Sequence, residues 1–473
     1  MSSFPRRFSL KSISNNLYLR YVHGRNELNG FLQFSAKEAA SPYTMFEIEE
    51  SSFGHGYVHI RCCYNNKYWA LQSPSSSYIV ATANEKDETL SEHSCTLFKP
   101  NYKDNDNKHD TFRFRHVFLN SCVFFQPARE SAYHDCLMLS GHALPNELST
   151  VINWDTYLFL PRHVAFKSLK NNKYLQPKSF LIEKTYQLAL NGSNTADPKM
   201  LHEVIKTPDG HFGLKNLAHR KFFTRVTDGT WIVLDNDSST AKDDPGRLFW
   251  PIKLDHNVVA LRSAKDYRIC AYMSSALTGH QDGFEADLEN IEDSAKLEVM
   301  DFVLSRHIYN VGFHLSDARR YNEKPLLMTS TIVENNNSQD KKFTIKLSYQ
   351  DTTTSTWRVN VNPMLGIKMK FETAVPKVSE EEIEFCSQLS EDYYTWGETH
   401  QMKYHAEFVH EVTVPAGTKV KASVVATQAS CDIPFSYIQR DKLNDGGYST
   451  QRYHDGLYNV VNSYNFHFVV EKV

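Results

Sequence analysis

The chain has 473 residues, with 52 basic and 55 acidic side chains and a net charge of −3. A chain of this length predicts roughly two to four domains, and because no third of it is basic, nucleic acid is not an expected partner. No run approaches the roughly 18 apolar residues that a membrane-spanning helix requires.

The start of the chain and its cysteines bear on the cellular compartment. Residues 1–11 contain no apolar run long enough for a signal peptide. We therefore expect a cytoplasmic or nucleocytoplasmic protein whose eight cysteines are reduced rather than paired in disulfides. Secretion by another route would reverse both expectations.

The chain contains internal repeats. The phrase at residues 10–19, Leu-Lys-Ser-Ile-Ser-Asn-Asn-Leu-Tyr-Leu, returns at residues 166–175 as Phe-Lys-Ser-Leu-Lys-Asn-Asn-Lys-Tyr-Leu. Related copies follow at residues 58–69, 118–124, 213–223 and 259–269. This spacing predicts two large blocks, each with three units of roughly 45–55 residues.

Each unit has the pattern of a strand, a turn rich in Asn or Asp, and a second strand. Helical periodicity is nearly absent, so the predicted fold class is all-β. Because a lone hairpin cannot bury its apolar face, three units around a pseudo-threefold axis predict a closed β architecture with one shared core. A tandem of unrelated β-sandwiches is the alternative.

The pattern changes near residue 305. Beyond it, alternation rich in serine and threonine dominates, as in Lys342–Tyr349 and Thr356–Val361. Long strands with polar outer faces are typical of an elongated antiparallel domain.

Motifs for catalysis and metal binding are absent from the sequence. It contains no Cys-x-x-Cys pair, no His-Glu-x-x-His, no P-loop and no Gly-x-Ser-x-Gly. We therefore expect no catalytic residues, no metal and no cofactor, and an enzyme is the remotest of the possible function classes.

Several phrases in the first two blocks resemble amaranthin-type plant agglutinins. They include Lys67–Pro74 (Lys-Tyr-Trp-Ala-Leu-Gln-Ser-Pro), Gly30–Ser35, Ala81–Glu85, Cys95–Pro100 and Asn171–Leu175. The resemblance implies two tandem β-trefoil domains, which we place at residues 1–158 and 159–305. It also implies lectin activity toward galactose- or N-acetylgalactosamine-type glycans and glycoproteins, with the sugar bound where subunits of a homo-oligomer meet.

In that family, the loop that follows Ser73–Pro74 contacts sugar. The resemblance therefore implies carbohydrate-binding roles for Ser75, Ser76, Ser77 and Tyr78. Hydroxyls can both donate and accept, and an aromatic face can pack on sugar C–H groups.

This loop departs from the family pattern, which has asparagine and further aromatics where this chain has Gln72 and plain serines. The alternative is a solvated loop in an interaction or scaffold protein that has lost sugar binding. In the matching loop of the second block, Trp231 is either a stacking platform for sugar or a core residue.

The third segment resembles the aerolysin-type pore-forming module. The motifs that carry this resemblance are Phe371–Pro376, Tyr394–Glu398 and Val412–Val420. The resemblance covers residues 306–473 and implies an elongated β domain that oligomerises and releases an amphipathic hairpin into a membrane. Agglutinin–aerolysin fusions imply a role in plant defence.

The candidate hairpin alternates apolar and charged residues, over about nine positions in each arm, close to the roughly 9–11 that a tilted transmembrane strand needs. The predicted membrane-facing residues are Ile367, Met369, Phe371, Val375, Ile383, Phe385 and Leu389. The charges at its tip, Lys377 and Glu380–Glu382, would cross the hydrocarbon at a cost of about 2–4 kcal/mol each. A surface hairpin that protects an edge strand from aggregation is the alternative.

Overall fold

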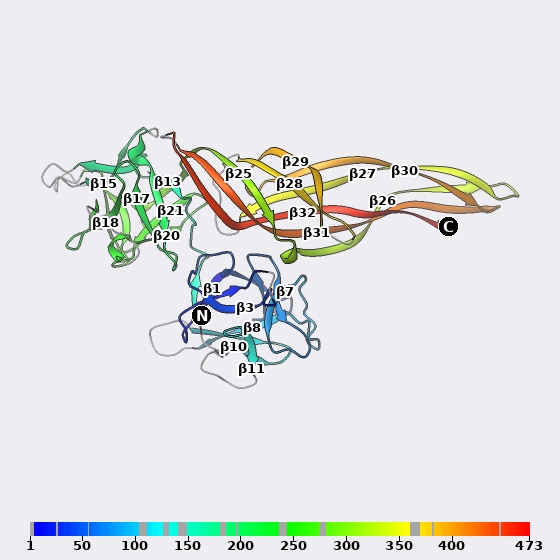
Figure 1. Ribbon diagram of the computed structural model, residues 1–473, viewed down its shortest axis with the longest axis horizontal. Coiled ribbons are helices and arrows are strands. Elements are labelled where there is room, and N and C mark those ends of the chain that lie inside the picture. The colour runs from blue at the N-terminus through cyan, green and yellow to red at the C-terminus, as the bar shows by residue number, and fades with distance from the viewer. Residues whose placement is uncertain are drawn as a thin grey trace. The chain divides into compact units, whose positions relative to one another are not determined.

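The computed structural model of the chain is built almost entirely from β-strands, which confirms the predicted all-β class (Figure 1). It describes residues 4–24, 27–54, 56–103, 111–125, 132–140, 149–179, 186–194, 197–235, 244–274, 281–359, 369–380, 383–443 and 446–473. The helices in these ranges are single 3-10 turns: η2 (Pro198–Met200), η4 (Pro245–Arg247), η5 (Asp293–Ala295) and η6 (Leu315–Asp317). No helix of the described chain has the length and apolar character for a membrane crossing.

The described chain divides into two compact units. The first contains Met1–His307 together with Gln439–Gln451, and the second contains Ile308–Val359, Met369–Ile438 and Arg452–Val473. Each unit is described in its own right below.

The first block of the sequence forms one twelve-stranded sheet within the first unit. Its strands are β1 (Arg7–Ser12), β2 (Tyr18–Tyr21), β3 (Leu32–Ala36), β4 (Phe46–Glu50), β5 (Val58–Cys62), β6 (Tyr68–Leu71), β7 (Ile79–Ala83), β8 (Leu97–Lys103), β9 (Thr111–His116), β10 (Ser121–Phe125), β11 (Leu137–Ser140) and β12 (Ser149–Asn153). Antiparallel pairing closes β1, β4, β5, β8, β9 and β12 into a barrel, and the other strands form the hairpins β2–β3, β6–β7 and β10–β11. Three repeats, each with two barrel strands and one hairpin pair, make this a β-trefoil.

The second block repeats this arrangement. Its strands are β13 (His163–Ser168), β14 (Tyr174–Ser179), β15 (Tyr186–Gly192), β16 (His202–Lys206), β17 (Phe212–Asn216), β18 (Lys221–Arg225), β19 (Ile232–Leu234), β20 (Phe249–Lys253), β21 (Val258–Ser263), β22 (Ile269–Met273), β23 (Gly283–Leu288) and β24 (Leu297–Asp301). Strands β13, β16, β17, β20, β21 and β24 close the barrel. In both barrels the inward residues of every repeat meet in one buried cluster, around Trp69 in the first and around Phe166 in the second. The predicted closed architecture is therefore confirmed, and the alternative of unrelated sandwiches is wrong.

The repeated Asn-Asn phrase acts as a brace for the turn. The first asparagine of the pair, Asn15, Asn65 or Asn171, accepts the backbone N–H two residues later at 3.0–3.1 Å. Its amide also donates to a carbonyl of another strand of its repeat at 2.8–3.3 Å. The second asparagine has a positive φ of 62, 59 or 63°, a conformation that asparagine tolerates better than most residues. The sequence repeat is therefore a repeat of turn geometry.

An aromatic segment joins the two trefoils within the first unit. The rings of Trp154 and Trp250 are stacked, with centroids 5.9 Å apart and an interplanar angle of 14°. Trp154 donates from Nε1 to the Ser9 hydroxyl at 2.7 Å, and the Tyr157 hydroxyl donates to the Gly210 carbonyl at 2.6 Å. Gly210 has a φ of +99°, and a Cβ there would lie 2.8 Å from the Trp154 ring. The linker therefore binds both barrels through packed rings and buried hydrogen bonds.

A buried charge cluster lies where the chain leaves the second trefoil. Arg306 contacts Asp301 of β24 at 2.8 Å and Asp441 at 2.6 Å, and Gln439 donates to Asp441 at 2.8 Å. Burial raises the pKa of Asp301. Removal of one partner from such a cluster typically costs about 3–5 kcal/mol, so these contacts fix Gln439–Gln451 to the first unit.

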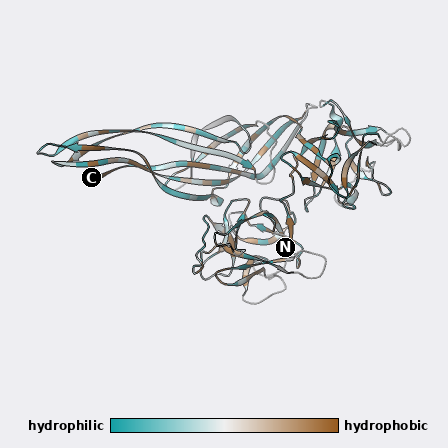
Figure 2. Ribbon diagram, turned by 180° about the vertical axis from the view of Figure 1, so that it is seen from behind, coloured by the Kyte–Doolittle hydropathy of each residue, from teal (hydrophilic) through white to brown (hydrophobic). Residues whose placement is uncertain are grey.

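The long strands are β25 (Val303–Phe313), β26 (Arg319–Asn335), β27 (Lys341–Val359), β28 (Met369–Val378), β29 (Ile383–Tyr394), β30 (Thr399–Val414), β31 (Thr418–Leu443) and β32 (Tyr448–Lys472). They form one eight-stranded sheet, most of which lies in the second unit. Figure 1 shows β26, β27, β30, β31 and β32 extended alongside one another. Polar and apolar residues are mixed along these strands (Figure 2), as in β27, where Ile345 and Leu347 are buried and Lys346 is exposed.

His202 makes the second trefoil sensitive to acid. Its side chain is fully buried and its Nε2 lies 3.1 Å from the Leu175 carbonyl, so this nitrogen carries the proton. Burial disfavours the imidazolium and lowers the pKa to about 4 from an ordinary 6.5. The unfolded chain therefore binds the proton first, so the contribution of neutral His202 to stability is present above pH 6.5 and is lost as the pH falls toward 4.

We expect the His202→Gln variant, which keeps a side-chain N–H donor, to lose less stability than the wild type between pH 6.5 and 4. The expected difference is about 3 kcal/mol, from the shift of two to three pKa units, and thermal or urea unfolding at each pH measures it. His256→Gln, at an exposed position of the same trefoil, is the control and should follow the wild type. Equal pH dependence of all three proteins would contradict the assignment.

Candidate functional site

The predicted sugar-contacting loop, Ser75–Tyr78, connects β6 and β7 in the second repeat of the first trefoil. The Ser76 hydroxyl donates to Gln72 Oε1 at 2.9 Å and accepts the Tyr78 N–H at 3.1 Å. The hydroxyl of Ser75 is exposed and lies 3.4 Å from that of Ser73. Of these groups, Ser76 is held within the loop, while Ser75 is open to a ligand.

Tyr78 lies at the pseudo-threefold cap of the trefoil. Bridges between equivalent positions of the three repeats form this cap: Phe31 with Val80, Tyr78 with Met138, and Cys136 with Gln33. The Tyr78 ring contacts Phe31 and Tyr133 at centroid distances of 5.6 and 5.3 Å, and it is only half-buried. Tyr78 therefore packs on the cap with one face and leaves part of its ring accessible.

Tyr133 is a candidate that sequence reasoning missed. It comes from the third repeat, 55 positions after Tyr78 in the chain, and it is half-buried against the same cap. The available signal was the internal repeat itself, because equivalent loops of a trefoil meet at its axis.

Trp231 occupies the same position in the second trefoil as Tyr78 does in the first. The Val226 N–H donates to the Trp231 carbonyl at 3.0 Å, as the Gln72 N–H donates to the Tyr78 carbonyl at 3.0 Å. Trp231 bridges to Glu285, whose carboxylate accepts the Thr230 hydroxyl at 2.5 Å. Trp231 is half-buried, so the ring is neither fully in the core nor fully free of it.

Trp231 and Thr230 offer groups of the kind that a sugar needs, and beside them lies the carboxylate of Glu285, which is only 7% exposed. A carboxylate accepts hydrogen bonds from sugar hydroxyls, and an aromatic face packs on C–H groups. Glu285 was not a candidate from the sequence, because it lies in β23, 54 positions beyond Trp231. Since the two loops belong to different barrels, Ser75–Tyr78 and Trp231 are two candidate sites rather than one.

The predicted membrane hairpin is β28–β29 in the second unit, and its arms have 10 and 12 residues. Met369 and Phe371 are fully buried, while Glu372 is exposed. The Phe371 ring packs on Trp357 and Trp396 at centroid distances of 4.8 and 5.3 Å. The apolar face of the first arm is therefore docked on the aromatic core of this unit.

The expected alternation fails after Thr373. The register between the two arms shifts between Ala374 and Pro376, which pair with Leu389 and Phe385, so that one residue of β28 lies opposite three of β29. Such an irregularity interrupts the strict alternation of faces along a strand. Val375, which strict alternation places with Phe371, is therefore half-buried, while Pro376 and Val378 are buried.

The other predicted hairpin residues are described in part. Ile383 is half-buried at the start of β29. Phe385 pairs with Pro376 and Leu389 with Ala374 in the backbone register, and their side chains lie outside the described part of the structure. Ile367 lies outside the described residues altogether.

A side-chain amide clasps the end of the first arm. The Val378 N–H donates to Asn462 Oδ1 at 3.0 Å, and Asn462 Nδ2 donates to the Val378 carbonyl at 2.8 Å. The amide oxygen accepts and the amide nitrogen donates, as the backbone of a neighbouring strand would. Arg320 donates to the carbonyls of Ser379 and Glu380, at 3.2 Å each.

The lysine at the hairpin tip also has a partner. Lys377 donates to the Tyr404 hydroxyl of β30 at 3.2 Å and lies 4.8 Å from the centre of its ring. In the folded protein Lys377 thus contacts the sheet, while Glu381 and Glu382 lie outside the described residues.

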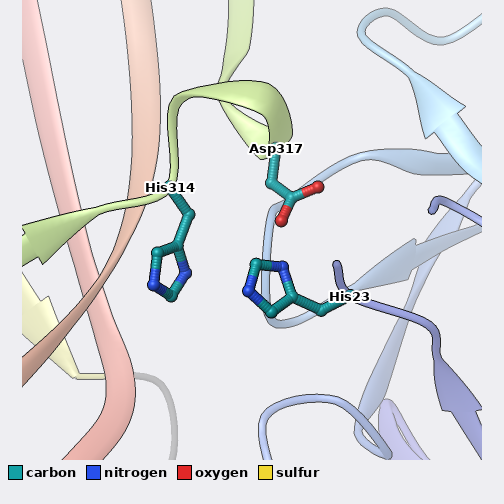
Figure 3. A group of neighbouring side chains, drawn as sticks. All are labelled: His23, His314 and Asp317. Carbon is teal, nitrogen blue, oxygen red and sulfur yellow. The ribbon is translucent and has the colours of Figure 1, made fainter. Parts of the chain in front are cut away.

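Two further side chains with possible metal-ligating groups lie close together in the second unit. His314 and Asp317 flank and end η6, and the Asp317 N–H donates to the His314 carbonyl at 3.0 Å (Figure 3). Figure 3 also draws His23, a residue of the first unit. Within that unit, His23 Nδ1 lies 3.2 Å from the Tyr64 hydroxyl. A pair of ligands is short of the four that structural sites for zinc use.

Comparison with known proteins identifies the first two sheets. The model of the agglutinin domain matches residues 2–125 and 158–300, more than half of the chain. A search of curated proteins returns no match.

Solved structures similar to the chain include a hemolytic lectin, CEL-III, with a TM-score of 0.30 and 9% identity over 97% of this chain and 91% of that one. A lamprey immune protein has a TM-score of 0.29 and 13% identity, over 71% of this chain and 83% of its own. A mosquitocidal holotoxin has a TM-score of 0.29 and 10% identity, over 66% of this chain and 36% of its own. All three TM-scores are below 0.5, so the fold assignment rests on the strand pairing described above.

We expect Asn462→Ala to loosen the hairpin, because Val378 then loses the partners of both its buried backbone groups. An unsatisfied buried group costs about 1–3 kcal/mol, so amide exchange at the end of β28 should quicken about tenfold or more. Hydrogen exchange resolved by mass spectrometry measures this, with β31 as the internal reference. His467→Ala, at an exposed position of the same strand as Asn462, is the control. Unchanged exchange at β28 in Asn462→Ala would refute the clasp.

Proposed function

The chain belongs to the agglutinin domain family, and from this premise we propose that it is a lectin with two glycan-binding trefoils and a third domain that assembles on membranes. The family match over both trefoils is the observation that carries the lectin half of the proposal. The proposed ligands are galactose- and N-acetylgalactosamine-type glycans and glycoproteins. The proposed roles of the molecule are non-enzymatic.

The two equivalent loops support the sugar-binding half of the proposal. Each trefoil presents a half-buried aromatic ring at the same position, Tyr78 in one and Trp231 in the other. Hydroxyls accompany both rings, and Glu285 adds an acceptor beside Trp231. Weak contacts at two such loops on one chain, multiplied across a homo-oligomer, would give avidity on a glycan-coated surface.

The β28–β29 hairpin supports the membrane half. Its arms are as long as a tilted transmembrane strand, about 9–11 residues. It lies in the chain between β27 and β30, which pair with each other over a 16-residue ladder from Lys341 to Thr356. Release of the hairpin at these connections would leave that ladder in place.

Release carries a cost. Met369 and Phe371 are fully buried, and exposing such side chains costs about 1.5–3 kcal/mol each. Insertion into lipid would recover this cost, because the same face would again be removed from water. We propose that assembly on a glycan-coated membrane supplies the trigger, and that the cytoplasmic protein serves in plant defence.

A second function has its own observation. The Ser76 hydroxyl is already bonded within its loop to Gln72 and to the Tyr78 N–H, as expected of a structural turn in a scaffold protein without sugar binding. Haemagglutination discriminates the two functions, since agglutination by a lectin is inhibited by galactose or N-acetylgalactosamine.

We expect the full-length protein to bind galactosyl glycans on an array, and Trp231→Ala and Tyr78→Ala each to weaken this binding. A stacking contact of about 1 kcal/mol predicts a loss of roughly fivefold per site. Exposed Tyr393 lies in the second unit, and Tyr393→Ala is the matched control, which should bind as the wild type does. Absence of binding to every glycan by the folded wild type would favour the scaffold function.

Probe labelling tests the hairpin. We expect an environment-sensitive dye on Val375→Cys to shift to the blue when the protein meets liposomes that carry its glycan. A regular inserted strand would bring Val375 onto the lipid face with Met369 and Phe371. The same dye on Glu372→Cys, on the opposite parity, should stay in water and is the control. Leakage of the liposomes without any shift at Val375 would place the membrane segment elsewhere, and no shift together with no leakage would overturn insertion.

A further inference from the structure

A cationic cavity lies on the outer face of the first trefoil, away from the Ser75–Tyr78 loop in the sequence. Its volume is about 450 Å³, and its lining residues are Tyr57, Lys99, Asn101, Arg113, Arg115, Val117 and Asn120. Three of them are cations, and none of these described lining residues is a carboxylate. This is notable in a chain whose net charge is −3.

The cations are placed by the β8–β9 ladder. Lys99 is directly opposite Arg115, and Asn101 is directly opposite Arg113. Like charges opposite each other on neighbouring strands are destabilising. Within the described chain, neither Lys99 nor Arg115 forms an ion pair with a carboxylate. The ladder therefore keeps an unfavourable arrangement that an anion would relieve.

The second repeat of the same trefoil shows how this face is otherwise neutralised. In that repeat, Glu47 occupies the position that corresponds to Lys99, and Arg61 occupies the one that corresponds to Arg115. These two residues are again opposite each other on paired strands. Arg61 contacts Glu47 at 2.5 Å and Glu49, the counterpart of Asn101, at 2.8 Å. The third repeat thus has neither carboxylate at these positions.

The arginine itself is held in the same way in both repeats. Arg61 donates to the turn asparagine Asn66 at 2.6 Å, and Arg115 donates to Asn120 at 2.9 Å. The guanidinium of Arg115 is therefore fixed as that of Arg61 is, but it has no carboxylate partner among the residues that the structure describes. Arg113, where the second repeat has His59, adds a further cation.

The second trefoil uses the equivalent face differently. The matching strands β20 and β21 carry Trp250, Ile252 and Ala260 where the first trefoil has Lys99, Asn101 and Arg113. Trp250 is packed on Trp154 of the linker, and Tyr157 bridges to Ile252. The counterpart of Arg115 there is again an arginine, Arg262, opposite Trp250. The positions of Lys99 and Arg113 are apolar, so the lysine and the second arginine of the first trefoil are not a requirement of the barrel.

We propose that this cavity binds the sulfate or carboxylate group of an acidic saccharide. An arginine fork and a lysine hold such a group by charge-assisted hydrogen bonds. The amides of Asn101 and Asn120 can reach sugar hydroxyls, and the Tyr57 ring, with Lys99 Nζ 5.8 Å from its centre, offers a face for C–H groups. The inference rests on the proposed lectin function and narrows its ligand class to acidic glycans.

A saccharide suits the cavity better than a lipid surface. The site is a concave pocket with amides and an aromatic ring beside its cations, whereas attachment to anionic lipid uses clusters of lysine and arginine spread over a face. No third of the chain has the basic excess that a polybasic surface requires.

Titration calorimetry of the full-length protein with 6-sulfo-N-acetyllactosamine and with unsulfated N-acetyllactosamine tests the proposal. We expect the sulfated disaccharide to bind about tenfold tighter or more at 50 mM salt, and the advantage to shrink at high salt. In Lys99→Glu, which restores the pairing seen in the second repeat, the advantage should vanish while unsulfated binding is unchanged. The melting temperature should not fall, because a like-charge pair becomes an opposite-charge pair.

Lys253→Glu is the matched control, with the same change of charge at an exposed position of the second trefoil, and it should keep the advantage. Equal affinity of the wild type for both disaccharides would overturn the acidic-glycan site and leave the lectin function intact. Binding of the sulfated form alone would support the site and contradict recognition of neutral galactosides. A third outcome would overturn the proposal in favour of a lipid headgroup. In it, the wild type binds vesicles with anionic lipid but neither disaccharide, and Lys99→Glu abolishes the vesicle binding.

Discussion

Barrel closure is the constraint on which the first unit depends. Among the described residues every barrel strand pairs with a neighbour on both sides, so no barrel strand is a free edge of the sheet. Closure requires each repeat to reverse direction at a fixed place, and the turn asparagines set that place. The side chain of Asn65 is fully buried and bonds both its own turn and the carbonyl of Ala81. The repeated phrase persists in the chain because the turn needs both a left-handed residue and an internal acceptor.

A closed barrel fixes its inner residues and leaves its outer residues to vary. Phe98 and Phe114 point into the core of the first trefoil and are almost fully buried. The residue that follows each of them, Lys99 or Arg115, points outward. The outer position can therefore be a carboxylate bound to an arginine, a cation beside a cavity, or a tryptophan packed on a linker. Because three different side chains occupy this outer position on the same barrel, the fold does not determine its identity. A ligand or a packing contact can.

The second unit follows a different rule, because its strands are long and part of its apolar surface is covered by the β28–β29 hairpin. The Phe371 ring packs on the Trp357 ring. The side-chain amide of Asn462 binds the backbone N–H and carbonyl of Val378, as a neighbouring strand would. Burial of the aromatic and apolar side chains stabilises the docked hairpin, and this effect is non-directional. Lipid could therefore bury the same side chains. The amide clasp is directional and is lost in any other arrangement. The stability of the docked hairpin is therefore divided between contacts that a membrane could replace and contacts that it could not.

The sequence by itself determined the all-β class, the two blocks of three repeats and the turn positions, since alternation and Asn-Asn turns are local properties of the chain. It also grouped Met369 with Phe371 on one apolar face, and both are buried in the structure, because two-residue periodicity holds within an uninterrupted strand. It could not place Val375, since the shift in register after Ala374 depends on the partner strand. Nor could it find Tyr133, Glu285 or the Lys99–Arg115 pair, each of which is created by pairing between strands far apart in the chain. Only the tertiary structure decided these, because barrel closure and strand register bring together residues whose separation in sequence carries no signal of contact.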